Sequence, residues 1–560
     1  MSLPSSVSVE RQIVLLYHRI NLSSMSPSEK NSLRTQLLVL LKKPGLFQFL
    51  LTSPAAVPIE EWVPCSKTVM EITTCFLAMG IIYELGSCAV DEFRISTAMA
   101  TQFLSVFWPR AIVWIPFIHP AYGILRHHPH HVNALTSVLP VAYKMAGCTR
   151  QLRERFPLLC KFTVSLWFHS AARLEHHEAD MEEEVDRLRM LGDCVRDMIS
   201  TKVSIYGRPG SSRRILSAIQ DDLLLVGGTP CSILERLLRS AGILLAFTRL
   251  SSSGDSTALC PHLQVIAALA EEVLPVTRLS RRIMRNAVDL ARGAYCDKDA
   301  AATCGLVLTL WTVADDDNPL IWSLRYGFVE VLQMNLEGTQ QSRWAEALRY
   351  IANRTTIRSV LRALSMKVDP CSSWFGKAVT ESDTESEYDV QATIRERVDS
   401  LNGLAKTTCC NSQVESSRKL LRSFSSSSLS HNSAKGALDQ AFATVQVLQY
   451  LQGKESRNII EDIVKSAGGC QHDPKLVIVE VHLDRLPPHH RVVLRRGSLN
   501  ASPQTMIEVR ARQFKKQTRI AVIELSVAIS MMMPSKVGAP SKSCVLSYTN
   551  AVYKHHINPQ

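Results

Sequence analysis

The first two thirds of the sequence is one amphipathic helical segment after another, with almost no alternating strand pattern. In "SPSEKNSLRTQLLVLLKKPG", Ser26 is expected to be the N-cap, Pro27 the first helical residue and Glu29 the partner that completes a capping box. The segment ends at Pro44-Gly45. A helix with one apolar stripe must bury that stripe against other elements. The stripe here is Leu33, Leu37, Leu40 and Leu41.

Two further segments follow the same pattern. "TPCSILERLLRSAGILLAF" has Thr229 as its expected cap, and "MEEEVDRLRMLGDCVRDMI" is expected to leave its acidic run on the exposed face. Short breaks rich in Gly, Pro or Ser separate such helices. The pattern favours an irregular helical array of the armadillo or HEAT kind over residues 1–366. No repeat of fixed period is present, so a helical bundle stays open as the alternative. The two expected stripes are Leu234, Leu237, Leu238 and Ala241, and Met181, Val185, Leu188, Val195 and Met198.

The character changes over residues 367–436. "TESDTESEYD" (380–389) is acidic and "RSFSSSSLSHNS" (422–433) is rich in serine, so neither holds enough apolar residues to pack. We therefore expect a largely disordered linker. A short amphipathic helix is predicted between the two stretches, with Val390, Ile394, Val398 and Leu401 on its apolar face.

Residues 437–560 read as a second ordered module. Two helical segments precede four segments with strand character, at 475–483, 491–495, 505–512 and 519–529. The predicted fold class is therefore mainly α: an irregular armadillo- or HEAT-like array followed by a small C-terminal α+β module with an antiparallel sheet.

Positive charge concentrates in this last module. From Gln471 to Gln560 there are 13 Lys and Arg against 5 Asp and Glu, which supplies +8 of the net charge of +12. A positive strand face would meet a phosphate backbone or an acidic protein surface, but the region is poor in aromatic residues for base stacking. The expected basic patch is Arg495, Arg496, Arg510, Arg512, Lys515, Lys516 and Arg519.

Cysteine usage and apolar runs bear on the compartment. The fifteen cysteines are scattered, apart from the pair Cys409-Cys410, and no C-x-x-C occurs. The first twenty residues lack a signal-peptide core, so we expect an intracellular protein, cytoplasmic or nuclear. The longest apolar runs, such as 301–314, fall short of the ~20 residues of a membrane span, so no membrane is expected.

Histidine doublets are the most conspicuous short motif. In "RHHPHHV" (126–132) the flanking residues offer no acidic or thiol ligand, and Pro129 suggests a loop with solvated imidazoles. His176 and Asp180 share a helical face with His169, but His169 and His176 lie ~10.5 Å apart along a helix, too far to grip one ion. A surface ion pair is the simpler interpretation.

No nucleophile elbow, H-E-x-x-H motif or phosphate-binding loop is present. We therefore assign no catalytic residues and no cofactor. The aromatic stretch at 106–122, with its three prolines, is expected to be core rather than a groove.

Several hydroxyl residues lie in contexts that kinases prefer. Ser498 follows two arginines in "LRRGSL", and the acidic stretch offers hydroxyls with an acidic residue three positions on. Phosphorylation would add up to ~2 negative charges at each site. The expected acidic-context sites are Thr380, Ser382, Thr384 and Ser386.

The order of these parts resembles that of a protein family from mushroom-forming (agaricomycete) fungi. The members of that family are mostly uncharacterised proteins with a MYND-type zinc finger. The finger would open near "AKTTCCNSQ", and "LVIVEVHLDRLPPHHRVV" with "RIAVIELSVAIS" is similar to the family's C-terminal module. The sequence departs from that family at the finger itself, where the paired C-x-x-C ligands are missing. The four weak zinc candidates are Cys409, Cys410, Cys470 and His472.

The function expected from the sequence is a non-enzymatic intracellular scaffold that binds other proteins through the helical array. The alternative is a nucleic-acid-associated protein that uses the basic C-terminal module. An enzyme without a recognisable motif is third. The sequence leaves partner identity and oligomeric state open.

Overall fold

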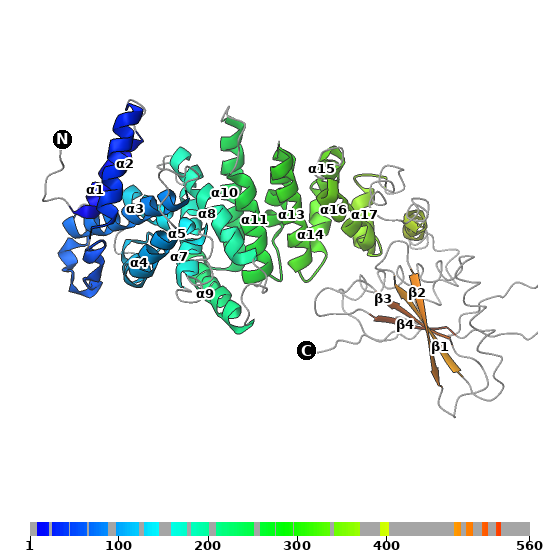
Figure 1. Ribbon diagram of the computed structural model, residues 1–560. Helices are drawn as coiled ribbons and strands as arrows, with labels where there is room; N and C mark the ends of the chain where they lie inside the picture. The colour runs from blue at the N-terminus through cyan, green and yellow to red at the C-terminus, as the bar shows by residue number, and fades with distance from the viewer. Residues whose placement is uncertain are drawn as a thin grey trace, which may run out of the picture. The chain divides into compact units, whose positions relative to one another are not determined.

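The fold is mainly α, and the chain divides into two compact units, Met1–Val276 and Thr277–Gln560 (Figure 1). The expected array over 1–366 is therefore divided between two units, here called unit 1 and unit 2. The computed structural model describes residues 8–21, 25–43, 45–63, 66–87, 97–122, 128–144, 158–175, 181–200, 209–250, 258–274, 276–294, 296–335, 341–369 and 393–402, with the backbone of four strands between 475 and 527.

The described residues of unit 1 form α-helices and three 3-10 helices. Its last helix continues into a π-helical turn, η5. The elements are α1 (Val9–Ile20), α2 (Pro27–Leu41), η1 (Gln48–Leu51), η2 (Pro54–Ala56), η3 (Ile59–Glu61), α3 (Lys67–Ser87), α4 (Thr97–Ile118), α5 (Pro129–Lys144), α7 (Leu158–Arg173), α8 (Met181–Ser200), α9 (Pro209–Gly227), α10 (Pro230–Leu250), α11 (Leu259–Ala268) and η5 (Leu269–Val273).

Two of these helices begin at the N-cap residues that the sequence predicts. The Ser26 hydroxyl accepts the Glu29 N–H, and the Glu29 carboxylate accepts the Ser26 N–H at 3.0 Å, so the capping box is confirmed. The Thr229 hydroxyl accepts the Ser232 N–H at 3.2 Å and caps α10. All four predicted stripe residues of α2 are buried, and so are those of α10.

The core of unit 1 forms where α3 packs between α1 and α5, and where α7 packs against α8 and α9. Among the described residues one helix, α3, is long and apolar enough to cross a membrane over Lys67–Leu85, and 67% of that stretch is buried within unit 1. The expectation from uninterrupted runs missed it, because polar residues such as Glu71 and Thr73 lie within the stretch.

Phe47, just before η1, adopts a left-handed backbone conformation with φ of 63°. Such a conformation is strained for a bulky residue. The Phe47 N–H donates to the buried Glu10 carboxylate of α1 at 2.5 Å, and its ring meets Phe107 of α4 edge-on at 5.0 Å. Helix α1 thus holds a turn 37 residues away in sequence.

The helices of unit 2 surround an aromatic core. Trp311 donates from Nε1 to the Ser323 hydroxyl at 3.0 Å, stacks on Tyr350 at 5.6 Å and meets Phe328 edge-on at 5.2 Å. Trp344 extends the cluster from α16. The helices are α12 (Arg281–Gly293), α13 (Asp297–Val313), α14 (Asn318–Arg325), α15 (Phe328–Asn335), α16 (Gln341–Arg354) and α17 (Arg358–Ser365).

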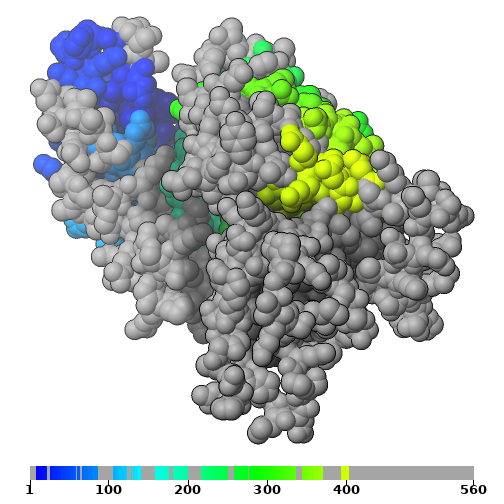
Figure 2. All heavy atoms as spheres, turned by 90° about the vertical axis from the view of Figure 1, so that its right-hand side faces the viewer, coloured from blue at the N-terminus to red at the C-terminus, as the bar shows by residue number. Residues whose placement is uncertain are grey.

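A further helix spans 393–402, inside the segment expected to be largely linker and close to the short helix predicted there. Figure 2 shows it in yellow beside the green residues of unit 2. Ile394, Arg397 and Ser400 are buried, three residues apart on one face. Apart from residues 367–369, the rest of the expected linker lies outside the described residues.

The four strands are β1 (Lys475–His482), β2 (His489–Arg496), β3 (Ile507–Arg512) and β4 (Val522–Val527), in the order β2-β1-β3-β4. The outer pairs are antiparallel, but β1 and β3 are parallel. The expectation of an antiparallel sheet is therefore wrong at the central pair. Parallel neighbours need a longer connection than a hairpin, and residues 483–506, which include all of β2, supply it.

Candidate functional site

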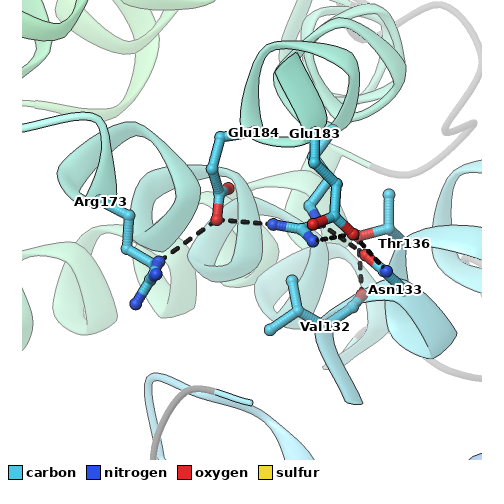
Figure 3. A network of polar contacts seen from close by, with 7 residues as sticks. Val132, Asn133, Thr136, Arg173, Glu183 and Glu184 are labelled. Carbon is cyan, nitrogen blue, oxygen red and sulfur yellow. Dashed lines mark hydrogen bonds and ion pairs between the residues drawn. The ribbon is translucent and has the colours of Figure 1, made fainter. Parts of the chain in front are cut away.

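A polar network in the interior of unit 1 includes Asn133, Arg173, Glu183 and Glu184 (Figure 3), and Arg187 of α8 contacts three of these four side chains. Its guanidinium donates from Nη1 to Glu184 at 2.6 Å, from Nη2 to Glu183 at 2.5 Å and from Nε to the Asn133 amide oxygen at 2.7 Å. Arg173 of α7 reaches the same Glu184 oxygen at 3.2 Å. Two arginines therefore balance two glutamates, and the network ties α5, α7 and α8 together.

This network corrects the expectation for the acidic run of α8. Glu184 is buried, not exposed, and Arg187 is buried beside it. A carboxylate loses its hydration when it is buried, and a close cation and hydrogen bonds are needed to compensate for that loss. The partners Arg173 and Asn133 come from other helices, so the sequence of α8 alone could not reveal the burial.

A second polar cluster joins the turn after α4 to α7 and α9. The hydroxyls of Tyr122 and Ser165 both donate to the Asp222 carboxylate, and Lys161 lies 3.0 Å from that carboxylate. The Tyr122 and Ser165 oxygens are 2.6 Å apart. No sequence motif links these residues, because their spacings differ and the fold alone brings them together.

The chemistry of this cluster favours a structural role. Burial, and then the hydrogen bond to Asp222, raise the pKa of Tyr122 far above its ordinary value. A phenol that holds its proton this tightly is a poor general base, and Ser165 donates to a carboxylate that already has an ion-pair partner. Ser, Lys and Tyr side chains are close together here, and all three are paired with the same carboxylate, that of Asp222.

Two buried histidines in unit 1 are neutral. Burial lowers the pKa of His119 to about 3 and that of His262 to about 4. The Ala121 N–H donates to Nδ1 of His119 at 3.1 Å, so Nε2 carries the proton and donates to the Phe162 carbonyl at 3.0 Å. Nε2 of His262 lies 2.9 Å from the Ser240 hydroxyl.

The histidine doublets give a different picture from the expected loop. Pro129 begins α5, His130 is exposed and His131 is buried, so the expectation of solvated loop imidazoles is wrong for His131. The ring of His128 lies 4.7 Å from that of His131. Within the described ranges, no group of three or more His, Cys, Asp or Glu is arranged to hold a metal ion. His176 and Asp180 fall outside those ranges.

The expected basic patch is only partly within the described residues. Arg495 and Arg496 lie in β2, and Arg510 and Arg512 in β3. The register pairs Arg510 with Glu480 of β1 on one side and Glu524 of β4 on the other. This row of the sheet therefore alternates in charge. Lys515, Lys516 and Arg519, the phosphosites Thr380, Ser382, Thr384, Ser386 and Ser498, and the zinc candidates Cys409, Cys410, Cys470 and His472 lie outside the described residues.

One side of helix α4 carries exposed apolar side chains, together with the exposed Gln102 and the half-buried Arg110. Val106 is 38% and Val113 50% exposed, and Pro109 between them is also exposed. The three share one side of the helix by their spacing. The opposite side is core, with Trp108 and Trp114 fully buried. The expectation of core for 106–122 is therefore correct for one face of α4 and wrong for the other.

No protein-family model, curated protein or solved structure matches the chain. The resemblance to fungal MYND-type proteins therefore stays a prediction.

Proposed function

We propose that the chain is a non-enzymatic intracellular scaffold that binds partner proteins through its helical units. The observation that carries this proposal is the exposed apolar face of α4, formed by Val106, Pro109 and Val113. Exposed apolar side chains grouped on one helix face are typical of protein-interaction sites, whereas scattered ones are normal on any surface.

The buried polar groups support the same proposal. The Arg187 network and the Asp222 cluster pair their charges and hydroxyls with one another. Such groups stabilise the fold, because each finds its partner inside unit 1. An enzyme would instead aim convergent polar groups at a substrate.

The finer features belong to the same proposal. We infer that the helices form an irregular array of the armadillo or HEAT kind, and that a phosphorylated linker joins it to a C-terminal α+β module. Arrays of this kind offer long surfaces to partner proteins. The chemical pattern at Thr380, Ser382, Thr384 and Ser386 supports the phosphorylation.

A photo-crosslinking amino acid at position 113 of the full chain, expressed in cells, tests the α4 face. The matched control is position 39 on α2, where Val39 is 57% exposed but belongs to a different helix. We expect position 113 to capture a defined set of proteins that survives nuclease, and position 39 to capture little. Adding Val106→Glu should remove those crosslinks, because a carboxylate disrupts an apolar contact.

Two outcomes would contradict the proposal. Equal capture at positions 113 and 39 would mean that the α4 face is ordinary surface. Loss of all captured proteins on nuclease treatment would instead favour the nucleic-acid alternative, whose binding should also weaken steeply with salt.

A further inference from the structure

Arg397 of the helix 393–402 is buried against the C-terminal end of α16. Its Nη1 donates to the Thr355 hydroxyl at 2.7 Å and to the Ala352 carbonyl at 3.2 Å. The side chain is 2% exposed, and Thr355 is fully buried. A long cationic side chain thus enters the interior from a segment that follows a stretch poor in apolar residues.

The receiving side of this contact is built to accept a cation. The last carbonyls of a helix carry partial negative charge, and the Ala352 carbonyl accepts the Thr355 N–H at 3.1 Å in addition to Arg397. The Thr355 hydroxyl donates to the Ala352 carbonyl at 2.6 Å, so its lone pairs are oriented toward Arg397. The guanidinium completes a closed set of hydrogen bonds among Arg397, Thr355 and Ala352.

The donor helix uses one face for this contact. Ile394 and Ser400 are buried on either side of Arg397, while Arg395 and Glu396 are exposed. The pattern is an aliphatic residue, an arginine and a small hydroxyl residue at intervals of three. Burial lowers the pKa of the Arg397 guanidinium to about 9, so the group stays charged at neutral pH.

The connection between the two sides is long. Residues 370–392 separate this helix from the last described residue of the preceding segment, Asp369. An amphipathic helix that buries Ile394, Arg397 and Ser400 on one face, and that follows a connection of this length, has the features of a bound peptide ligand. A helix of the same chain competes with a free peptide at an effective concentration that is set by the length of the connection.

We propose that the end of α16, at Ala352 and Thr355, is a recognition site for an arginine-bearing amphipathic helix, occupied by the chain's own residues 393–402. The partner class that fits this site is a helix with an aliphatic residue three positions before the arginine and a small hydroxyl residue three positions after it. The site uses residues of unit 2 only, so it stands independently of the α4 face.

The test uses the full chain carrying Arg397→Ala and a fluorescent peptide of residues 390–404. We expect this variant to bind the peptide at least about tenfold more tightly than the unaltered chain does, because the unaltered chain's own helix competes at high effective concentration. A peptide with Arg397→Ala should bind at least about tenfold more weakly, since a hydrogen-bonded charge is lost. A peptide with Arg395→Ala is the matched control and should bind like the original.

A second variant examines the receiving side. In the full chain with both Arg397→Ala and Thr355→Val, the peptide should lose at least about tenfold in affinity, because valine keeps the shape but removes the acceptor. Hydrogen exchange of α16 and α17 reports whether unit 2 stays folded in each variant.

Two results would overturn the proposal. If Arg397→Ala removes the protection of α12–α17, the helix 393–402 is an integral part of the fold and not a ligand. If unit 2 stays protected but binds the original and the Arg397→Ala peptides equally, the site does not recognise arginine. A concentration-dependent dimer of the unaltered chain that Arg397→Ala abolishes would support the site with a second copy as the occupant.

Discussion

Units 1 and 2 both bury arginines within packed helices, yet they differ in buried histidines. Unit 1 buries His119 and His262 in addition to Arg187, whereas residues 277–430 contain no histidine and bury Arg354 and Arg397. Arg354 lies 3.3 Å from Asp317 and over the Tyr350 ring at 5.1 Å, and Arg397 meets backbone and hydroxyl oxygens. Guanidinium groups keep their charge across the accessible pH range, and imidazoles do not. Similar folds can therefore differ in their response to acid.

The largest expected effect comes from the Arg187 network. Arg187→Ala should lower the stability of unit 1 by about 3 to 5 kcal/mol, because it leaves the buried Glu184 without its closest cation. Native-state hydrogen exchange of α5, α7 and α8 measures the change.

The control for that change is Arg189→Ala on the same helix. Arg189 pairs with Asp186 at the surface, where an ion pair contributes less than about 1 kcal/mol. Hydrogen exchange in α13 and α16, which belong to unit 2, should stay unchanged in both variants. An equal loss of protection there would show that the two units unfold as one, and the comparison would fail.

The next largest expected effect is that acid lowers the stability of unit 1 more than that of unit 2. The pKa of His119 is about 3 and that of His262 about 4 in the folded chain, against ~6.5 when unfolded, so the unfolded state binds more protons below pH 6.5. The two neutral histidines contribute fully to the free energy of unfolding above pH 6.5, and this contribution is lost as the pH falls toward 4. At pH 5 the free energy of unfolding should be lower by about 2 kcal/mol per histidine. Hydrogen exchange at pH 7.5 and 5.0, corrected for intrinsic rates, measures it unit by unit.

Substitutions identify the groups responsible. His119→Gln and His262→Gln should each reduce the acid-dependent loss by about 2 kcal/mol, whatever they do at pH 7.5. Unit 2 helices that lose as much protection as unit 1 would contradict the assignment.

The smallest effects test the backbone in both units. The methyl group added by Gly242→Ala in α10 or by Gly305→Ala in α13 has no neighbouring atom within 4 Å outside its own helix backbone. Each substitution should therefore stabilise its own unit by about 0.5 to 1 kcal/mol. Gly327→Ala should instead cost about 1 to 2 kcal/mol, because its φ is 91° and its added carbon would lie 3.1 Å from Arg292. Thermal or denaturant unfolding with peptide-level readout gives the sign in each unit.

Local signals in the sequence predicted the helices well. The capping box at Ser26, the cap at Thr229 and the helix near 390–401 depend only on neighbouring residues, and the structure contains each of them. Short-range hydrogen bonds and helical spacing determine such features, so one sequence is sufficient to find them.

Contacts between distant segments could not be predicted. Glu184 was expected in solvent because its own helix is acidic there, and Arg397 had no visible partner within its segment. Their partners, Arg173 and Thr355, come from other helices. The exposed side of α4 was missed for the opposite reason, because apolar composition predicts burial and does not tell which face a neighbour covers.

The left-handed backbone conformation of Phe47 makes the packing of unit 1 depend on its first helix, α1. Helix α1 packs against both α2 and α3. Here the α1 carboxylate of Glu10 holds a turn whose backbone alone is unfavourable by about 1 to 2 kcal/mol, and whose ring packs on α4. A chain that starts after α1 would lose the anchor for that turn along with its first helix, and the damage would spread to α4. The N-terminal boundary of any shortened version therefore has to lie before Ser8, the residue that caps α1.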